Sequence, residues 1–96
     1  MENNISDNIS VELEIINERG LHARAAASFV KTIDGLNADV QVERLGQVVD
    51  GNSIMGLMML AAAKGTKIKV SAAGTDAETA IANITQLVNG RFGEDR

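Results

Sequence analysis

Alternation of apolar and polar residues is the feature that most constrains how this chain of 96 residues can fold. In residues 9–15, Val11 and Leu13 belong to an apolar set, whereas Glu12 and Glu14 belong to a polar set. A period of two is typical of a strand with one buried face. Residues 38–43 and 66–72 repeat the pattern, and residues 47–50 follow a turn at Leu45-Gly46 as a short strand. The sequence therefore predicts four strands that share one apolar face.

Helical spacing of apolar residues separates these strands. Ala26, Phe29, Val30 and Ile33 form one stripe within residues 23–34. A second helix is predicted over residues 54–63, and a third begins after a capping box made by Thr75 and Glu78. The order βαββαβα predicts an α+β fold, a two-layer open-faced sandwich with a four-stranded antiparallel sheet and three helices on one face. We expect one domain over residues 9–90, between a flexible N-terminal tail (1–8) and a polar C-terminal tail (91–96).

Composition excludes several classes of function. The chain has no cysteine and one histidine, which removes disulfides, thiolate zinc sites and cysteine nucleophiles, so we expect neither a metal site nor a cofactor. The net charge of −4 disfavours nucleic acid as a partner. The N-terminus has no signal-peptide pattern, and no apolar run is long enough to insert into a membrane. We therefore expect a cytoplasmic protein.

The single histidine, His22, lies where the loop of residues 17–20 meets the first predicted helix. A helix start has unpaired N–H groups and a partial positive charge, and no Ser, Thr, Asp or Asn stands here to cap it. We expect the free N–H groups to bind an anion such as phosphate. A neutral imidazole is a nucleophile near pH 7, and the guanidinium of Arg24 suits phosphate oxygens. These features point to a phosphoryl group carried on His22, although a lone histidine near a helix start is more often a surface residue or a weak cap than a nucleophile.

The second informative segment begins at Ser53. Ser53 is a natural N-cap for the helix that follows it, and phosphorylation there would add negative charge beside that helix. Apolar side chains surround this helix instead of forming one stripe. Some of its methionines must then be exposed, which is typical of a docking surface, unless the whole helix is buried in the core.

These two segments resemble the signature regions of HPr, the histidine-containing phosphocarrier of the bacterial phosphoenolpyruvate-dependent phosphotransferase system. The resemblance rests on Gly20-Leu21-His22-Ala23-Arg24, on Ser53-Ile54-Met55-Gly56-Leu57-Met58 and on Ala63-Lys64-Gly65, in this order and spacing. It spans residues 11–90 and agrees with the predicted fold. One departure is Ala25, where most relatives have proline. The acidic end of the chain is also similar to that of NPr, the nitrogen-related paralogue, so the branch stays open.

The resemblance implies a function and its residues. Enzyme I would phosphorylate His22 on Nδ1, Arg24 would steady the phosphoryl group, and an EIIA-type domain would receive it. Four residues would form the docking surface: Ala27, Ile54, Met55 and Met58. Ser53 matches the serine that HPr kinase/phosphorylase modifies in bacteria that have this enzyme. The protein would be a carrier rather than an enzyme, and we expect it to be monomeric.

Three other functions stay open from the residues alone. A ligand-sensing module would need an apolar pocket with a polar cluster, and the sequence shows no such cluster. A regulatory interaction protein would use Ser53 as its switch without phosphoryl relay. A nucleic-acid binder would need stacking aromatics, and the chain has only two phenylalanines.

Overall fold

A computed structural model describes residues 8–96. The predicted N-terminal tail, residues 1–8, lies outside the described residues except for Asn8. The elements are β1 (Ile9–Glu14), α1 (Ala23–Ile33), β2 (Asp39–Arg44), β3 (Gln47–Asp50), α2 (Ile54–Met59), β4 (Lys67–Ala73), α3 (Ala77–Asn89) and the 3₁₀ helix η2 (Arg91–Gly93). The predicted α+β order is confirmed, with η2 as an addition.

The four strands form one antiparallel sheet in the order β1-β4-β2-β3. β4 is central, and its Val70 lies opposite Val11 on one side and Val42 on the other. On the opposite face, Lys69 lies between Glu12 and Glu43, so opposite charges are neighbours across the strands. The sheet therefore has one apolar and one charged face, as the alternation predicted.

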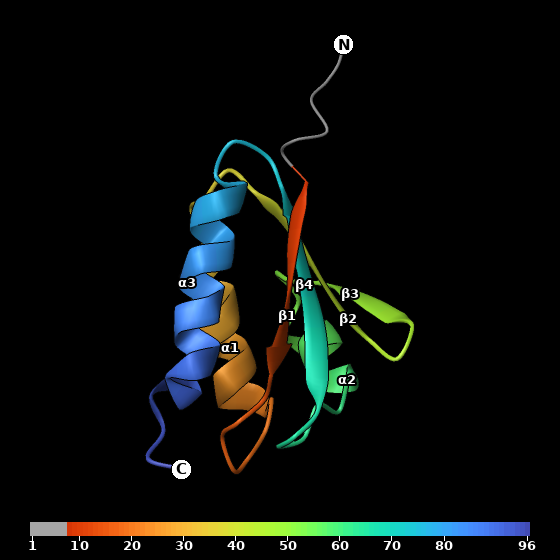
Figure 1. Ribbon diagram of the computed structural model, residues 1–96, viewed down its shortest axis with the longest axis vertical. Helices are drawn as coiled ribbons and strands as arrows, with labels where there is room; N and C mark the ends of the chain where they lie inside the picture. Colours follow the sequence, from red (N-terminus) through yellow and green to blue (C-terminus); the bar gives the residue numbers. More distant parts are fainter. Residues whose placement is uncertain (1–7) are drawn as a thin grey trace.

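The helices pack on the apolar face. Figure 1 shows α1 and α3 side by side on one side of the sheet, and α2 packs against α1 and β3 near one end. Leu57 of α2, Ile84 of α3 and Phe29 of α1 are fully buried in the layer between helices and sheet. Apart from the two phenylalanines, this core is aliphatic. Among residues 8–96, no helix is long and apolar enough to cross a membrane.

Two local predictions are wrong, both at helix ends. Helix α2 ends at Met59 instead of residue 63, and Ala61 adopts a left-handed φ of 51°. The reason is tertiary, because the carbonyl of Ala62 accepts a hydrogen bond from Leu21 N–H at 2.9 Å. The capping box of α3 is absent, since its N-cap is Asp76 and makes no side-chain cap bond. The Thr75 hydroxyl instead accepts a hydrogen bond from Asn37 Nδ2.

Candidate functional site

The loop between β1 and α1 holds His22 in place through close backbone packing. Gly20 has a left-handed φ of 71°, and a Cβ atom there would lie 2.6 Å from the Ala62 carbonyl oxygen. Only glycine fits this conformation and this contact. Leu21 is buried and donates its N–H to the same carbonyl. The loop is thus fixed against the segment after α2, and this fixes the start of α1.

His22 itself is the N-cap of α1. Its backbone is extended, and its Nδ1 atom accepts a hydrogen bond from Arg24 N–H at 3.2 Å. The prediction of an uncapped first turn was therefore wrong, because an imidazole nitrogen does what a serine or aspartate oxygen usually does. Among the described residues, the N–H groups of Ala23 and Ala25 still find no hydrogen-bond acceptor.

The other ring nitrogen contacts a carboxylate from the far end of the chain. His22 Nε2 lies 2.5 Å from Glu94 Oε2. The second oxygen, Oε1, accepts a hydrogen bond at 3.1 Å from Nδ2 of Asn17, which also donates to the Gly20 carbonyl at 2.8 Å. The side chains of His22 and Glu94 are 16% and 15% exposed. The ring is therefore bonded at both nitrogens and yet accessible at the surface.

The electrostatics favour an ionised Glu94. Burial by itself would raise the pKa of this carboxyl group, but the hydrogen bonds from His22 and Asn17 lower it. The charge of Arg19 acts in the same direction, and the pKa of Glu94 lies below its ordinary value of 4.5. Glu94 is thus a carboxylate at neutral pH.

The C-terminal segment, residues 91–96, packs against this site. Phe92 is 8% exposed and anchors η2 against α3 and α1. Arg91 and Phe92 both have left-handed backbones, with φ of 58° and 54°, and turn the chain back toward the β1–α1 loop. There Glu18 N–H donates to the Arg96 carbonyl at 3.0 Å. The segment set apart as a polar tail in the sequence is therefore a packed part of the site, as Figure 1 shows for the C-terminus beside the start of α1.

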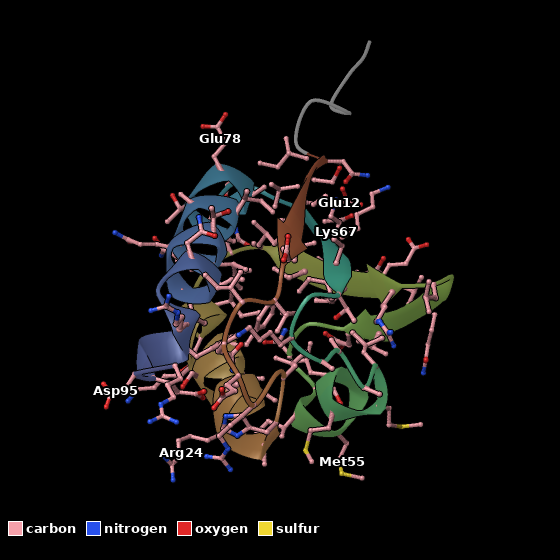
Figure 2. All side chains as sticks on the ribbon, turned by 60° about the horizontal axis from the view of Figure 1, so that its bottom comes forward. Glu12, Arg24, Met55, Lys67, Glu78 and Asp95 are labelled. Atoms are coloured by element: carbon pink, nitrogen blue, oxygen red, sulfur yellow. The ribbon has the colours of Figure 1, made fainter. Side chains whose placement is uncertain are left out.

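The other predicted site residues gather at the same end of the molecule. Figure 2 shows Arg24 and Met55 projecting there, with Glu78 at the opposite end. Arg24 and Ala27 are exposed, and Arg24 makes no ion pair within residues 8–96. On α2, Ile54, Met55 and Met58 are 40%, 71% and 41% exposed. The alternative of a fully buried α2 is therefore excluded, since only its Leu57 is buried.

Ser53 has the capping role predicted for it. Its hydroxyl oxygen accepts a hydrogen bond from Gly56 N–H at 2.9 Å, and its side chain is half-buried. The Ser53 hydroxyl therefore satisfies one N–H group of the first turn of α2. Among residues 8–96, no group of three or more His, Asp or Glu side chains is placed to hold a metal ion.

Two residues of this site, Asn17 and Glu94, were not predicted from the sequence. Asn17 was taken as part of a loop, whereas its side chain is fully buried. The Oδ1 atom of Asn17 is buried without a hydrogen-bond partner among the described residues. The side chain is therefore positioned by its Nδ2 atom, which donates to the Gly20 carbonyl and to Glu94. The only local signal was that Asn17, a polar residue, follows Leu13 and Ile15 at a spacing of two, where the alternation predicts a buried side chain. Glu94 had no signal, because its partner is 72 residues away in the chain.

Comparison with known proteins shows the family of this chain. The family model described as the PTS HPr component phosphorylation site matches residues 9–90. The chain belongs to the PTS HPr family. It is 50% identical over 82 residues to the phosphocarrier protein HPr of Neisseria meningitidis, covering 85% of this chain and 92% of that protein. It is also 38% identical over 84 residues to the phosphocarrier protein NPr of Escherichia coli, covering 86% of this chain and 93% of that protein.

Solved HPr structures have the same fold. The crystal structure of HPr-C-His from Thermoanaerobacter tengcongensis is 41% identical and superposes with a TM-score of 0.87, covering 92% of this chain and 99% of that one. HPr from Bacillus anthracis is 34% identical with a TM-score of 0.80, covering 84% and 96%. As a PTS HPr family member, this chain is a histidine phosphocarrier of the phosphotransferase system and not a turnover catalyst. Its partners are proteins of that system.

Proposed function

We propose that His22 is the residue that carries the phosphoryl group, on Nδ1. It would accept the group from phospho-Enzyme I and pass it to a histidine or cysteine of an EIIA-type domain. One observation carries this proposal. The chain has a single histidine, and its ring is partly exposed at a helix start beside an exposed arginine. Because phosphoenolpyruvate is a cytoplasmic metabolite, the proposal also places the chain in the cytoplasm.

The surroundings of His22 suit a phosphoryl group that must be released again. The N–H group of Ala23, an exposed residue, has no acceptor among the described residues, and the start of a helix favours an anion. Arg24 supplies a charge within the same turn, and its planar fork can bond two phosphate oxygens. Ala25, where most relatives have proline, keeps an N–H group that proline lacks, but the residue is fully buried and does not face the site. The site is shallow, so a bound group stays within reach of a partner.

The docking surface would consist of Ala27, Ile54, Met55 and Met58. All four are exposed, α1 and α2 pack together, and Figure 2 shows Met55 at the same end of the molecule as Arg24. Methionine side chains adapt to different shapes, which suits a carrier that binds a donor and several acceptors in turn. We expect the carrier to be a monomer, because a permanent dimer contact on this surface would compete with its partners.

Ser53 is proposed as a regulatory site in organisms with HPr kinase/phosphorylase. Its hydroxyl is half-buried and engaged as a cap, so modification would replace one cap oxygen by several. The added charge would lie beside Ile54 and Met55 and would oppose docking. This switch would act on the relay rather than replace it.

Labelling of the whole protein tests the function. The protein is incubated with phosphoenolpyruvate and Enzyme I, and mass spectrometry should find one acid-labile phosphate. His22→Ala should abolish the label while circular dichroism shows the fold intact. Arg24→Ala should keep the fold and slow transfer by roughly tenfold, since one charged hydrogen-bonding group is lost. A label that persists in His22→Ala would refute the proposal, and an unchanged rate in Arg24→Ala would refute the role of that side chain.

A further inference from the structure

The two nitrogens of His22 face groups of opposite polarity. Nδ1 lies 3.2 Å from Arg24 N–H, a donor, and Nε2 lies 2.5 Å from Glu94 Oε2, an acceptor. A neutral imidazole has one N–H and one lone pair, so only one of its two tautomers satisfies both contacts. The proton must be on Nε2. With the proton on Nδ1, two N–H groups would face each other, and a lone pair would face a carboxylate.

We infer that Glu94 is a positioning residue for phosphoryl transfer, which fixes the His22 ring in the tautomer whose free lone pair is on Nδ1. This inference rests on the proposed function of His22 and gives a structural reason why Nδ1 is free to react. It also gives the C-terminal segment a chemical role, because the side chain that orients the ring belongs to that segment.

Three contacts keep the Glu94 carboxylate in place. Asn17 Nδ2 holds its other oxygen at 3.1 Å and is itself fixed to the Gly20 carbonyl at 2.8 Å. Phe92, two residues earlier, is buried against α3 and α1. Glu18 N–H binds the Arg96 carbonyl on the far side. The carboxylate thus reaches the ring from a rigid support, which a positioning residue requires.

The transfer step balances as follows. The Nδ1 lone pair forms a bond to phosphorus while the phosphorus–nitrogen bond of an N-phosphorylated protein donor breaks, and that bonding pair returns to the donor ring. The proton on Nε2 stays where it is. The His22 ring then has phosphorus on one nitrogen and hydrogen on the other, and it carries a positive charge. Glu94 offsets this charge directly, and Arg24 N–H must release Nδ1 before the bond can form.

Nitrogen NMR of the whole protein, labelled with ¹⁵N in histidine, reads the tautomer without any phosphoryl transfer. In the native chain at neutral pH, Nε2 should have the shift of a protonated nitrogen and Nδ1 that of an unprotonated one. Glu94→Ala should change the ratio of the two tautomers by about tenfold, the worth of one charge-assisted hydrogen bond. Glu94→Gln should give an intermediate change. The matched control is Asp95→Asn, which removes the same charge from the exposed neighbouring residue and should leave the spectrum native.

Transfer from the phosphorylated donor is the second readout. Glu94→Ala should slow labelling of His22 roughly threefold to tenfold, as expected for loss of an orienting partner, with Asp95→Asn near native. A native ring protonated on Nδ1, or a Glu94→Ala spectrum identical to that of the native protein, would overturn the inference even if His22→Ala abolishes labelling. If the label persists in His22→Ala, the proposed function fails, whereas the spectrum still reports on the tautomer.

Discussion

The first turns of α1 and α2 each have a backbone N–H group that a side chain caps, and the two capping side chains differ. At α2, the hydroxyl of Ser53 accepts the Gly56 N–H at 2.9 Å. At α1, the ring of His22 accepts the Arg24 N–H at 3.2 Å. A hydroxyl fulfils its role once the cap is made, whereas an imidazole that caps with one nitrogen keeps a second nitrogen for another contact. At the start of α1, Nδ1 caps the helix and Nε2 contacts Glu94, so one side chain makes both contacts.

The two starts also differ in what lies over them. Residues 91–96 pack against the start of α1 and bring Glu94 to His22. The first turn of α2 presents Ile54 and Met55 to solvent instead. The His22 side chain is thus held by residues distant in sequence, whereas the apolar side chains at the start of α2 are open to solvent. This difference fits the proposed roles, because a reacting ring needs a fixed orientation and a surface for several partners needs adaptable side chains.

The largest expected effect comes from removing Phe92, which anchors the C-terminal segment beside the start of α1 and has no counterpart at α2. Phe92→Ala deletes a buried ring and should lower the free energy of unfolding by about 3 kcal/mol. It should also release Glu94 from His22, while α2 stays as it is. Urea unfolding gives the stability, and NMR shifts of His22 and Met55 give the local effects. NMR shifts that change equally at both helix starts would show that the effect is not confined to α1. A His22 ring with native shifts would show that the C-terminal segment does not hold it.

An intermediate effect tests the hydroxyl cap. Ser53→Ala should cost about 1 kcal/mol of stability, because the Gly56 N–H loses its acceptor. Ser53→Asp should restore part of that stability, since aspartate is a good N-cap, and yet weaken binding to a phosphotransferase partner. Calorimetry and a binding titration separate the two quantities. The control is Glu78→Asp, a conservative change at the far end of the molecule. A loss of affinity in Ser53→Asp no larger than in Ser53→Ala would contradict the role of charge at this surface.

The smallest effect is a pH dependence confined to the start of α1. The pKa of Glu94 is lowered in the folded protein, so its contribution to stability is complete above the ordinary value of 4.5. It is lost as the pH falls through the lowered value, because the protonated carboxyl binds His22 less well. The stability difference between the native chain and Glu94→Gln should therefore be below about 1 kcal/mol at neutral pH and vanish in acid. Denaturant midpoints at several pH values measure it. A difference that persists in acid would show that the carboxylate charge is not its source.

Local patterns were sufficient for most of the fold. The stripe of Ala26, Phe29 and Ile33 became the buried face of α1, and the alternation around Val11 and Val70 became the apolar face of the sheet. These predictions were right because burial of one face has a fixed period in a helix or a strand. Helix ends were less well predicted. The Thr75 hydroxyl accepts a hydrogen bond from Asn37 instead of forming the expected capping box. The Ala62 carbonyl accepts one from Leu21 N–H, beyond the end of α2.

By itself the sequence determined the order of strands and helices, the place of its one histidine at a helix start, and the cap at Ser53. Each of these depends on residues that are close together in the chain. Only the tertiary structure decided that Nδ1 of His22 caps its own helix and that Glu94, bonded to Asn17, contacts the other nitrogen. Those contacts join residues up to 77 positions apart. Side chains so distant in sequence come into contact only after the core has fixed the segments that carry them. No local sequence pattern predicts such a contact.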